Sequence, residues 1–85
     1  MNISEIAKEA LADISSKTKG CVRASRRGIV AASDRGGGHV TVFRRQGGKV
    51  HLELWLYGSQ KGLCLTEHPL AADLEQRAAT MLDEL

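Results

Sequence analysis

The chain has 85 residues, 42% of them hydrophobic and 26% charged, with nine glycines, one proline and one residue each of Phe, Trp and Tyr. A chain of this size forms one domain and buries about 60–65% of its unfolded surface, so we expect a single domain over residues 1–85. No apolar run approaches the roughly 18 residues of a membrane span, and charged residues interrupt the N-terminal segment where a signal peptide would lie. The sequence therefore predicts a cytoplasmic protein that does not enter a membrane.

Charge is segregated along the chain. Residues 1–16 carry a net charge of −2, residues 17–61 of +8 and residues 62–85 of −4. A basic middle segment attracts phosphate groups or an acidic protein surface. The plainer interpretation, which the sequence leaves open, is that Lys and Arg keep turns and strand edges solvated.

The cysteines and histidines give little sign of metal or redox chemistry. Cys21 and Cys64 lie among apolar or β-prone residues, which predicts small buried side chains rather than a disulfide. Only Cys64 and His68 are close in sequence, without the paired short spacings of a zinc site. The glycines at 36–38 lack the residues that complete a Walker motif. We expect neither a metal nor a cofactor.

The first half of the chain predicts one helix and two short strands. Asn2 followed by Glu5 is similar to a capping box, and apolar residues recur at helical spacing, which predicts a helix over Ile3–Ser16. Stretches rich in Val and Ile predict strands over Cys21–Ser25 and Gly28–Ser33.

The second half predicts a hairpin, an edge strand and a helix. Strands are expected over His39–Arg45 and Lys49–Tyr57, followed by an edge strand over Leu63–Thr66. Pro69 fits the first turn of a helix, and apolar residues repeat at helical spacing from Leu70 to the end. Together these elements predict a two-layer α+β domain: a four- to five-stranded antiparallel meander with an N-terminal and a C-terminal helix packed on one face.

The register of the hairpin decides which face carries the aromatic residues. A two-residue turn at Gly47-Gly48 pairs Arg45 with Val50, whereas a three-residue loop pairs Arg45 with Lys49. We prefer the second register because it gathers more aliphatic side chains on one face. That face would hold Val40, Val42, Val50, Leu52, Leu54 and Leu56. The opposite face would hold His39, Thr41, Phe43, Arg45, Lys49, His51, Glu53, Trp55 and Tyr57.

A basic and aromatic sheet face predicts contact with nucleic acid, since aromatic rings stack on bases while Arg and Lys neutralise phosphates. The first hypothesis is therefore a small non-catalytic protein that binds nucleic acid or a nucleoprotein complex. Its candidate phosphate contacts are Arg23, Arg26, Arg27, Arg35, Arg44, Arg45 and Lys49. Its candidate stacking groups are Phe43, Trp55 and Tyr57.

Two alternatives use the same residues differently. The second hypothesis is a protein-interaction module, an inhibitor or adaptor that docks its basic patch on an acidic protein surface and forms a homodimer through its aromatic face. The third hypothesis is a small ribonuclease in which His39 or His51 acts as general acid or base, with Glu53 on the same strand face as His51.

The order of elements also resembles the double-stranded RNA-binding domain. The resemblance rests on Gly36-Gly37-Gly38-His39 followed by Phe43, and on Gln76-Arg77-Ala78-Ala79 with Leu82 and Leu85. In that family, lysines at the start of the last helix contact phosphates, whereas this chain has Glu67, Asp73 and Glu75 in that region. The resemblance therefore implies a shared topology and not a function.

Overall fold

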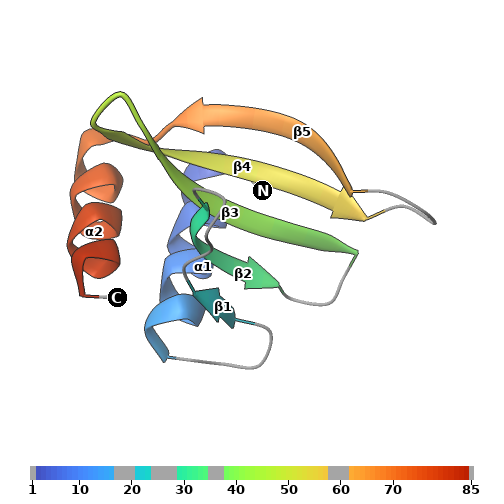
Figure 1. Cartoon of the computed structure of the whole chain (residues 1–85), viewed down its shortest axis with the longest axis horizontal. Helices are drawn as coiled ribbons and strands as arrows, with labels where there is room; N and C mark the ends of the chain where they lie inside the picture. The colour runs from blue at the N-terminus through green and yellow to red at the C-terminus, as the bar shows by residue number, and fades with distance from the viewer. Residues whose placement is uncertain (1, 17–20, 24–28, 35–37, 58–61, 85) are drawn as a thin grey trace.

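Both expected helices form in the computed structural model, on one face of a five-stranded antiparallel sheet with strand order β1-β2-β3-β4-β5 (Figure 1). The structure describes residues 2–16, 21–23, 29–34, 38–57 and 62–84. The elements are α1 (Ile3–Ser16), β1 (Cys21–Arg23), β2 (Ile29–Asp34), β3 (His39–Gln46), β4 (Lys49–Tyr57), β5 (Gly62–Pro69) and α2 (Ala72–Asp83). The predicted α+β class and the meander are confirmed, whereas the chain between the first two strands, residues 24–28, and the glycines at 36 and 37 lie outside the described residues.

Helix α1 begins at the predicted residue because Asn2 caps it. The backbone N–H of Glu5 donates to Asn2 Oδ1 at 2.9 Å, which satisfies one of the free donors of the first turn. The buried face of α1 comprises Ala7, Ala10, Leu11 and Ile14. This spacing of three or four residues places all four side chains toward the sheet.

The C-terminal part corrects the expected role of Pro69. Strand β5 extends to Pro69, so this residue ends an edge strand instead of opening the helix. Helix α2 starts at Ala72 and buries Leu74, Ala78 and Leu82 against the same face as α1. A proline is tolerated at this point because β5 lies at the edge of the sheet, where a missing N–H breaks no ladder on the outer side.

The preferred hairpin register is wrong. Arg45 pairs with Val50 and Phe43 pairs with Leu52, so the strands are joined by a two-residue turn. Gly47 and Gly48 have φ angles of +60° and +80°, a conformation that glycine adopts without strain. A shift of one residue moves every side chain of a strand to the other face. The predicted grouping of Val40 and Val42 with the leucines of β4 therefore does not occur.

The main core lies between the helices and the face that carries Phe43. Phe43, Leu52 and Leu11 are each at most 1% exposed and belong to one cluster with residues of α2. A smaller cluster lies on the other face and comprises Ala32, Val40 and Val42, with Trp55 packed against it. The sheet is thus apolar on both faces, but the described helices cover only one.

Candidate functional site

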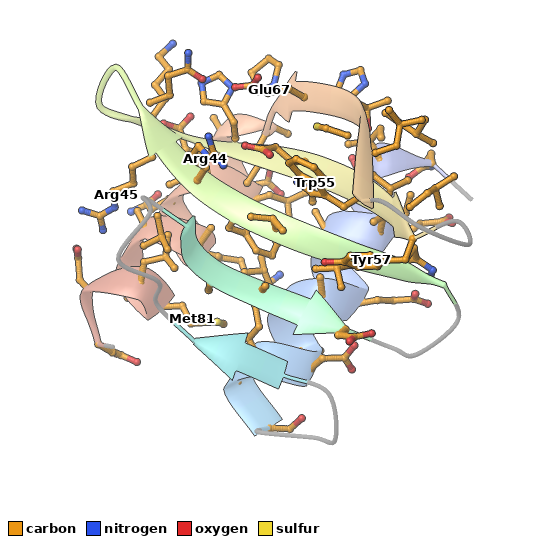
Figure 2. The ribbon with its side chains drawn as sticks, turned by 45° about the vertical axis from the view of Figure 1, so that its right-hand side comes forward. Arg44, Arg45, Trp55, Tyr57, Glu67 and Met81 are labelled. Atoms are coloured by element: carbon orange, nitrogen blue, oxygen red, sulfur yellow. The ribbon has the colours of Figure 1, made fainter. Side chains whose placement is uncertain are left out.

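The sheet face opposite the helices is the candidate site, and we call it the helix-free face. Strand alternation and register give it Ala32, Val40, Val42, Arg44, Lys49, His51, Glu53, Trp55, Tyr57, Gly62, Cys64 and Glu67. Figure 2 shows Arg44, Trp55 and Tyr57 along this face. Its aliphatic and aromatic residues lie toward the end formed by Tyr57, and its basic residues lie toward the Gly47-Gly48 turn.

A buried carboxylate holds the centre of this face together. Glu53 is only 3% exposed, and its Oε1 lies 2.8 Å from Arg44 Nε in an ion pair. Its Oε2 accepts a hydrogen bond of 2.8 Å from the indole N–H of Trp55 and a longer one, 3.8 Å, from the thiol of Cys64. Both oxygens are therefore partnered, which allows a charged group to remain buried.

Hydrogen bonds fix the ring of Trp55 and the backbone of Tyr57. The Trp55 indole is tied at its N–H to Glu53 and packs on the Ala32, Val40 and Val42 cluster, so Trp55 has little freedom to change orientation. The backbone N–H of Tyr57 donates to the carbonyl of Gly38 at 2.8 Å, which anchors the end of β4. The Tyr57 side chain is exposed, at 55%.

Gly62 is the position over which both rings lie. A Cβ at Gly62 would come within 3.3 Å of Tyr57 Cε1 and 3.4 Å of Trp55 Cε3. The absence of a side chain on β5 at this point lets the two rings rest side by side against the strand. The result is a pre-oriented tryptophan beside an accessible tyrosine.

The three predicted stacking groups do not share one face, because the observed register places Phe43 on the face opposite Trp55 and Tyr57. Phe43 is 0% exposed in the core under the helices, so it presents no ring to a base, and its assignment to the same face as Trp55 and Tyr57 is wrong. The error follows from the single-residue register shift.

The predicted phosphate contacts that the structure describes are largely engaged with carboxylates. Arg44 pairs with Glu53, and Arg45 lies on the helix side, where it pairs with Asp83 and donates to the carbonyl of Ala79 at 3.4 Å. Lys49 is exposed at the start of β4. The side chains of Arg23, Arg26, Arg27 and Arg35 lie outside the described part of the chain. The structure therefore brings Arg44 and Lys49 onto one face with Trp55 and Tyr57, and places Arg45 elsewhere.

Cys64 departs from the prediction of a buried cysteine. It is a free, exposed residue of β5, while the Cys21 side chain lies outside the described residues. Its thiol lies 3.8 Å from Glu53 Oε2 and 3.7 Å from the carbonyl of Thr66, and desolvation, followed by the charge of Glu53, raises the pKa of Cys64. Within the described residues, no group of three or more His, Cys, Asp or Glu side chains is arranged to hold a metal ion.

The residues of the ribonuclease hypothesis are placed on different faces. His39 pairs with Leu56 on the helix side, whereas His51 shares the helix-free face with Glu53. The Glu53 carboxylate is already engaged by Arg44 and Trp55. A shallow groove of about 540 Å³ also lies away from these histidines, between Ser15 and the Asp73–Glu84 part of the chain.

The large hydrophobic residues that are exposed gather at one corner of the sheet. Among the described residues they are Leu56 (40%), Tyr57 (55%) and Leu63 (60%) at the paired ends of β4 and β5, and Leu65 (49%), the bulged residue of β5 between Cys64 and Thr66. Figure 1 shows these strand ends extending beyond the helices. Exposed apolar side chains gathered in this way are typical of a contact surface.

Sequence reasoning missed three of these features: the role of Glu53 as an anchor, the close approach at Gly62, and the exposed leucines of β5. A signal for the first was present, because the Gly47-Gly48 turn places Glu53 diagonally across from Arg44.

Comparisons with known proteins give no relative for this chain: no family model, curated protein or solved structure matches it. In the part of the chain that the structure describes, no helix has the length and apolar character needed to cross a membrane.

Proposed function

We propose that the protein is a protein-interaction module that docks a partner protein on its helix-free face. The observation that carries this proposal is the fixed Trp55 beside the exposed Tyr57, on a sheet face that no described helix covers. Tyr and Trp are enriched at protein interfaces, and a rigid aromatic group loses little conformational entropy on binding.

The charges on this face support a protein partner over nucleic acid. Glu53 and Glu67 lie directly opposite each other between the basic end of the face and the aromatic end. A nucleic acid strand that stacked on Trp55 while its phosphates reached Lys49 would pass over these carboxylates. The exposed Glu67 would repel it.

Site-specific photo-crosslinking in cells tests the proposal. A photoreactive phenylalanine analogue at position 57 should give a discrete adduct with a partner protein. The same analogue at position 80, an exposed site on α2, serves as the matched control and should give none. Equal adducts from both positions, or no adduct from position 57, would refute docking through this face.

Nucleic-acid binding is retained as a second candidate because Lys49 is exposed on the same face as Tyr57 and because residues 17–61 carry a net charge of +8. Fluorescence anisotropy with labelled single- and double-stranded DNA and RNA at about 50 and 200 mM salt tests it. Micromolar binding that weakens steeply with salt, and weakens further in Lys49→Ala, supports this candidate. Absence of binding at the lower salt removes it.

A further inference from the structure

The exposed groups of the helix-free face follow a fixed order along β4. Tyr57 ends the strand with a ring that is 55% exposed, and the exposed Lys49 begins it. The exposed Glu67 lies opposite Glu53, the residue midway between these two ends. From one end to the other, the face therefore presents an aromatic ring, a negative charge and a positive charge.

The other charged pair of this face is neutralised within the protein. Arg44 Nε lies 2.8 Å from the buried carboxylate of Glu53, so the two opposite charges largely cancel. Within the described residues, neither Glu67 nor Lys49 forms an ion pair through its side chain. The fixed charges that a partner meets on the described face are therefore those of Glu67 and Lys49.

The spacing of these groups matches the repeat of an extended chain. Residues 49, 53 and 57 are four positions apart along β4, and at about 3.3 Å per residue each interval is about 13 Å. An extended segment laid along β4 rises by the same distance per residue, so every fourth side chain comes over one of the three groups. A helix, which rises about 1.5 Å per residue, would need about eight or nine residues for each interval. The equal rise therefore favours an extended occupant.

We propose that the helix-free face binds an extended segment of a partner protein in which a basic residue lies midway between an apolar and an acidic residue, at intervals of about four residues. The apolar side chain packs on Tyr57, the basic one pairs with Glu67 and the acidic one pairs with Lys49. This inference rests on the proposed role in protein interaction and adds the chemistry of the partner. Segments with the reverse charges meet like charges and are rejected.

The aromatic end offers a preformed contact for the apolar side chain. Figure 2 shows Trp55 between Arg44 and Tyr57 on this face. The hydrogen bond to Glu53 holds the Trp55 indole before a partner arrives, so little conformational entropy is lost when a side chain packs beside it.

Selection from a displayed peptide library tests the chemistry and the spacing together. The probe is a library of random peptides of about 20 residues, long enough for an extended or a helical segment to span β4, and the target is the immobilised full chain. We expect the enriched peptides to place a basic residue midway between an apolar and an acidic residue, at intervals of about four. No enrichment, no shared order of charges, or the intervals of about eight or nine residues that a helix requires, would overturn the inference.

Charge reversal identifies which residue of the face selects each position. Selection on Lys49→Glu should replace the acidic residue of the enriched peptides by a basic one, and selection on Glu67→Lys should replace the basic residue by an acidic one. A peptide enriched on the unchanged chain should bind Lys49→Glu at least about fivefold more weakly, and high salt should reduce this difference. The matched controls are Lys8→Glu and Asp73→Lys, which reverse exposed charges on the helices and should leave the enriched pattern unchanged.

An enriched pattern that neither reversal on the face alters would also overturn the inference. Photo-crosslinking at position 57 keeps its failure distinct from that of the proposed function. A discrete adduct at position 57, without the charge pattern in the selected peptides, would leave the proposed function standing, whereas absence of the adduct would remove both.

Discussion

At the scale of single residues, the fold depends on Phe43 and the candidate site on Trp55 and Tyr57. Phe43 is fully buried between the helices and the sheet, whereas Tyr57, the last residue of β4, is 55% exposed. The same chemical class of side chain thus serves the core in β3 and the surface in β4.

Alanine substitutions should separate these two roles. Phe43→Ala removes a ring from the core and should lower the free energy of unfolding by about 3–5 kcal/mol. Tyr57→Ala removes a largely exposed ring and should change it by less than about 1 kcal/mol. Urea denaturation of both variants measures the difference. The reverse order would mean that Phe43 lies on the helix-free face.

Two opposed glutamates provide a similar contrast. Glu53→Ala leaves the Arg44 guanidinium and the Trp55 indole N–H without their carboxylate, and should cost about 1–3 kcal/mol of stability. Glu67→Ala removes an exposed like charge opposite Glu53 and should be neutral or slightly stabilising. Thermal denaturation, followed by the fluorescence of the single tryptophan, reports both. Equal effects would contradict the anchoring role of Glu53.

The reactivity of Cys64 should depend on pH in a direction set by its surroundings. Because desolvation and, after it, the charge of Glu53 raise the pKa of the Cys64 thiol, its reactive thiolate forms at a higher pH than that of an ordinary cysteine. In Cys21→Ser protein, the rate at which Cys64 reacts with a disulfide reagent should therefore reach half its maximum at a higher pH than the rate of the glutathione thiol with the same reagent. Glu53→Gln should lower that midpoint. A midpoint at or below that of glutathione would be inconsistent with this environment.

At the scale of the elements, the turn between β3 and β4 determines what each face presents. Gly47 and Gly48 both have positive φ angles, so alanine at either position should cost about 1–2 kcal/mol. Gly47→Asn should be nearly neutral because asparagine is favoured at the first central position of such a turn. Chemical denaturation compares the three variants. If Gly47→Ala were as stable as the unchanged chain, the tight turn would be wrong.

The elements also show which parts of the fold can be predicted from the sequence. Helical spacing and the Asn2 cap predict α1 at its observed bounds, because both signals are local. The register of β3 and β4 is not local: it depends on which face the helices cover. Aliphatic residues occur on both faces, since Val40 and Val42 form a cluster with Trp55 while Val50 and Leu52 join the main core. Counting aliphatic residues on each face therefore favoured the wrong register, although the Gly47-Gly48 pair itself indicated the correct one.

At the scale of the whole molecule, the helices cover only part of the sheet face on which they pack. Helix α1 contacts β1–β3 and α2 contacts β4, while the far ends of β4 and β5 extend past both. This geometry leaves Leu56 and Leu63 exposed on the helix side, at the same end of β4 and β5 where Tyr57 is exposed on the helix-free face. The sequence predicted the two layers, but this uncovered corner arises from the relative lengths of strands and helices, which only the assembled structure defines.

The proposed surface depends on one structural fact, the two-residue register of the hairpin, because it separates Phe43 from Trp55 and Tyr57. The most direct measurement is a nuclear Overhauser spectrum that detects contacts between Cα protons of opposed residues. Our account predicts cross-strand contacts of Arg45 with Val50 and of Phe43 with Leu52. Contacts of Arg45 with Lys49 and of Phe43 with His51 would contradict it, because they would return Phe43 to the face that carries Trp55.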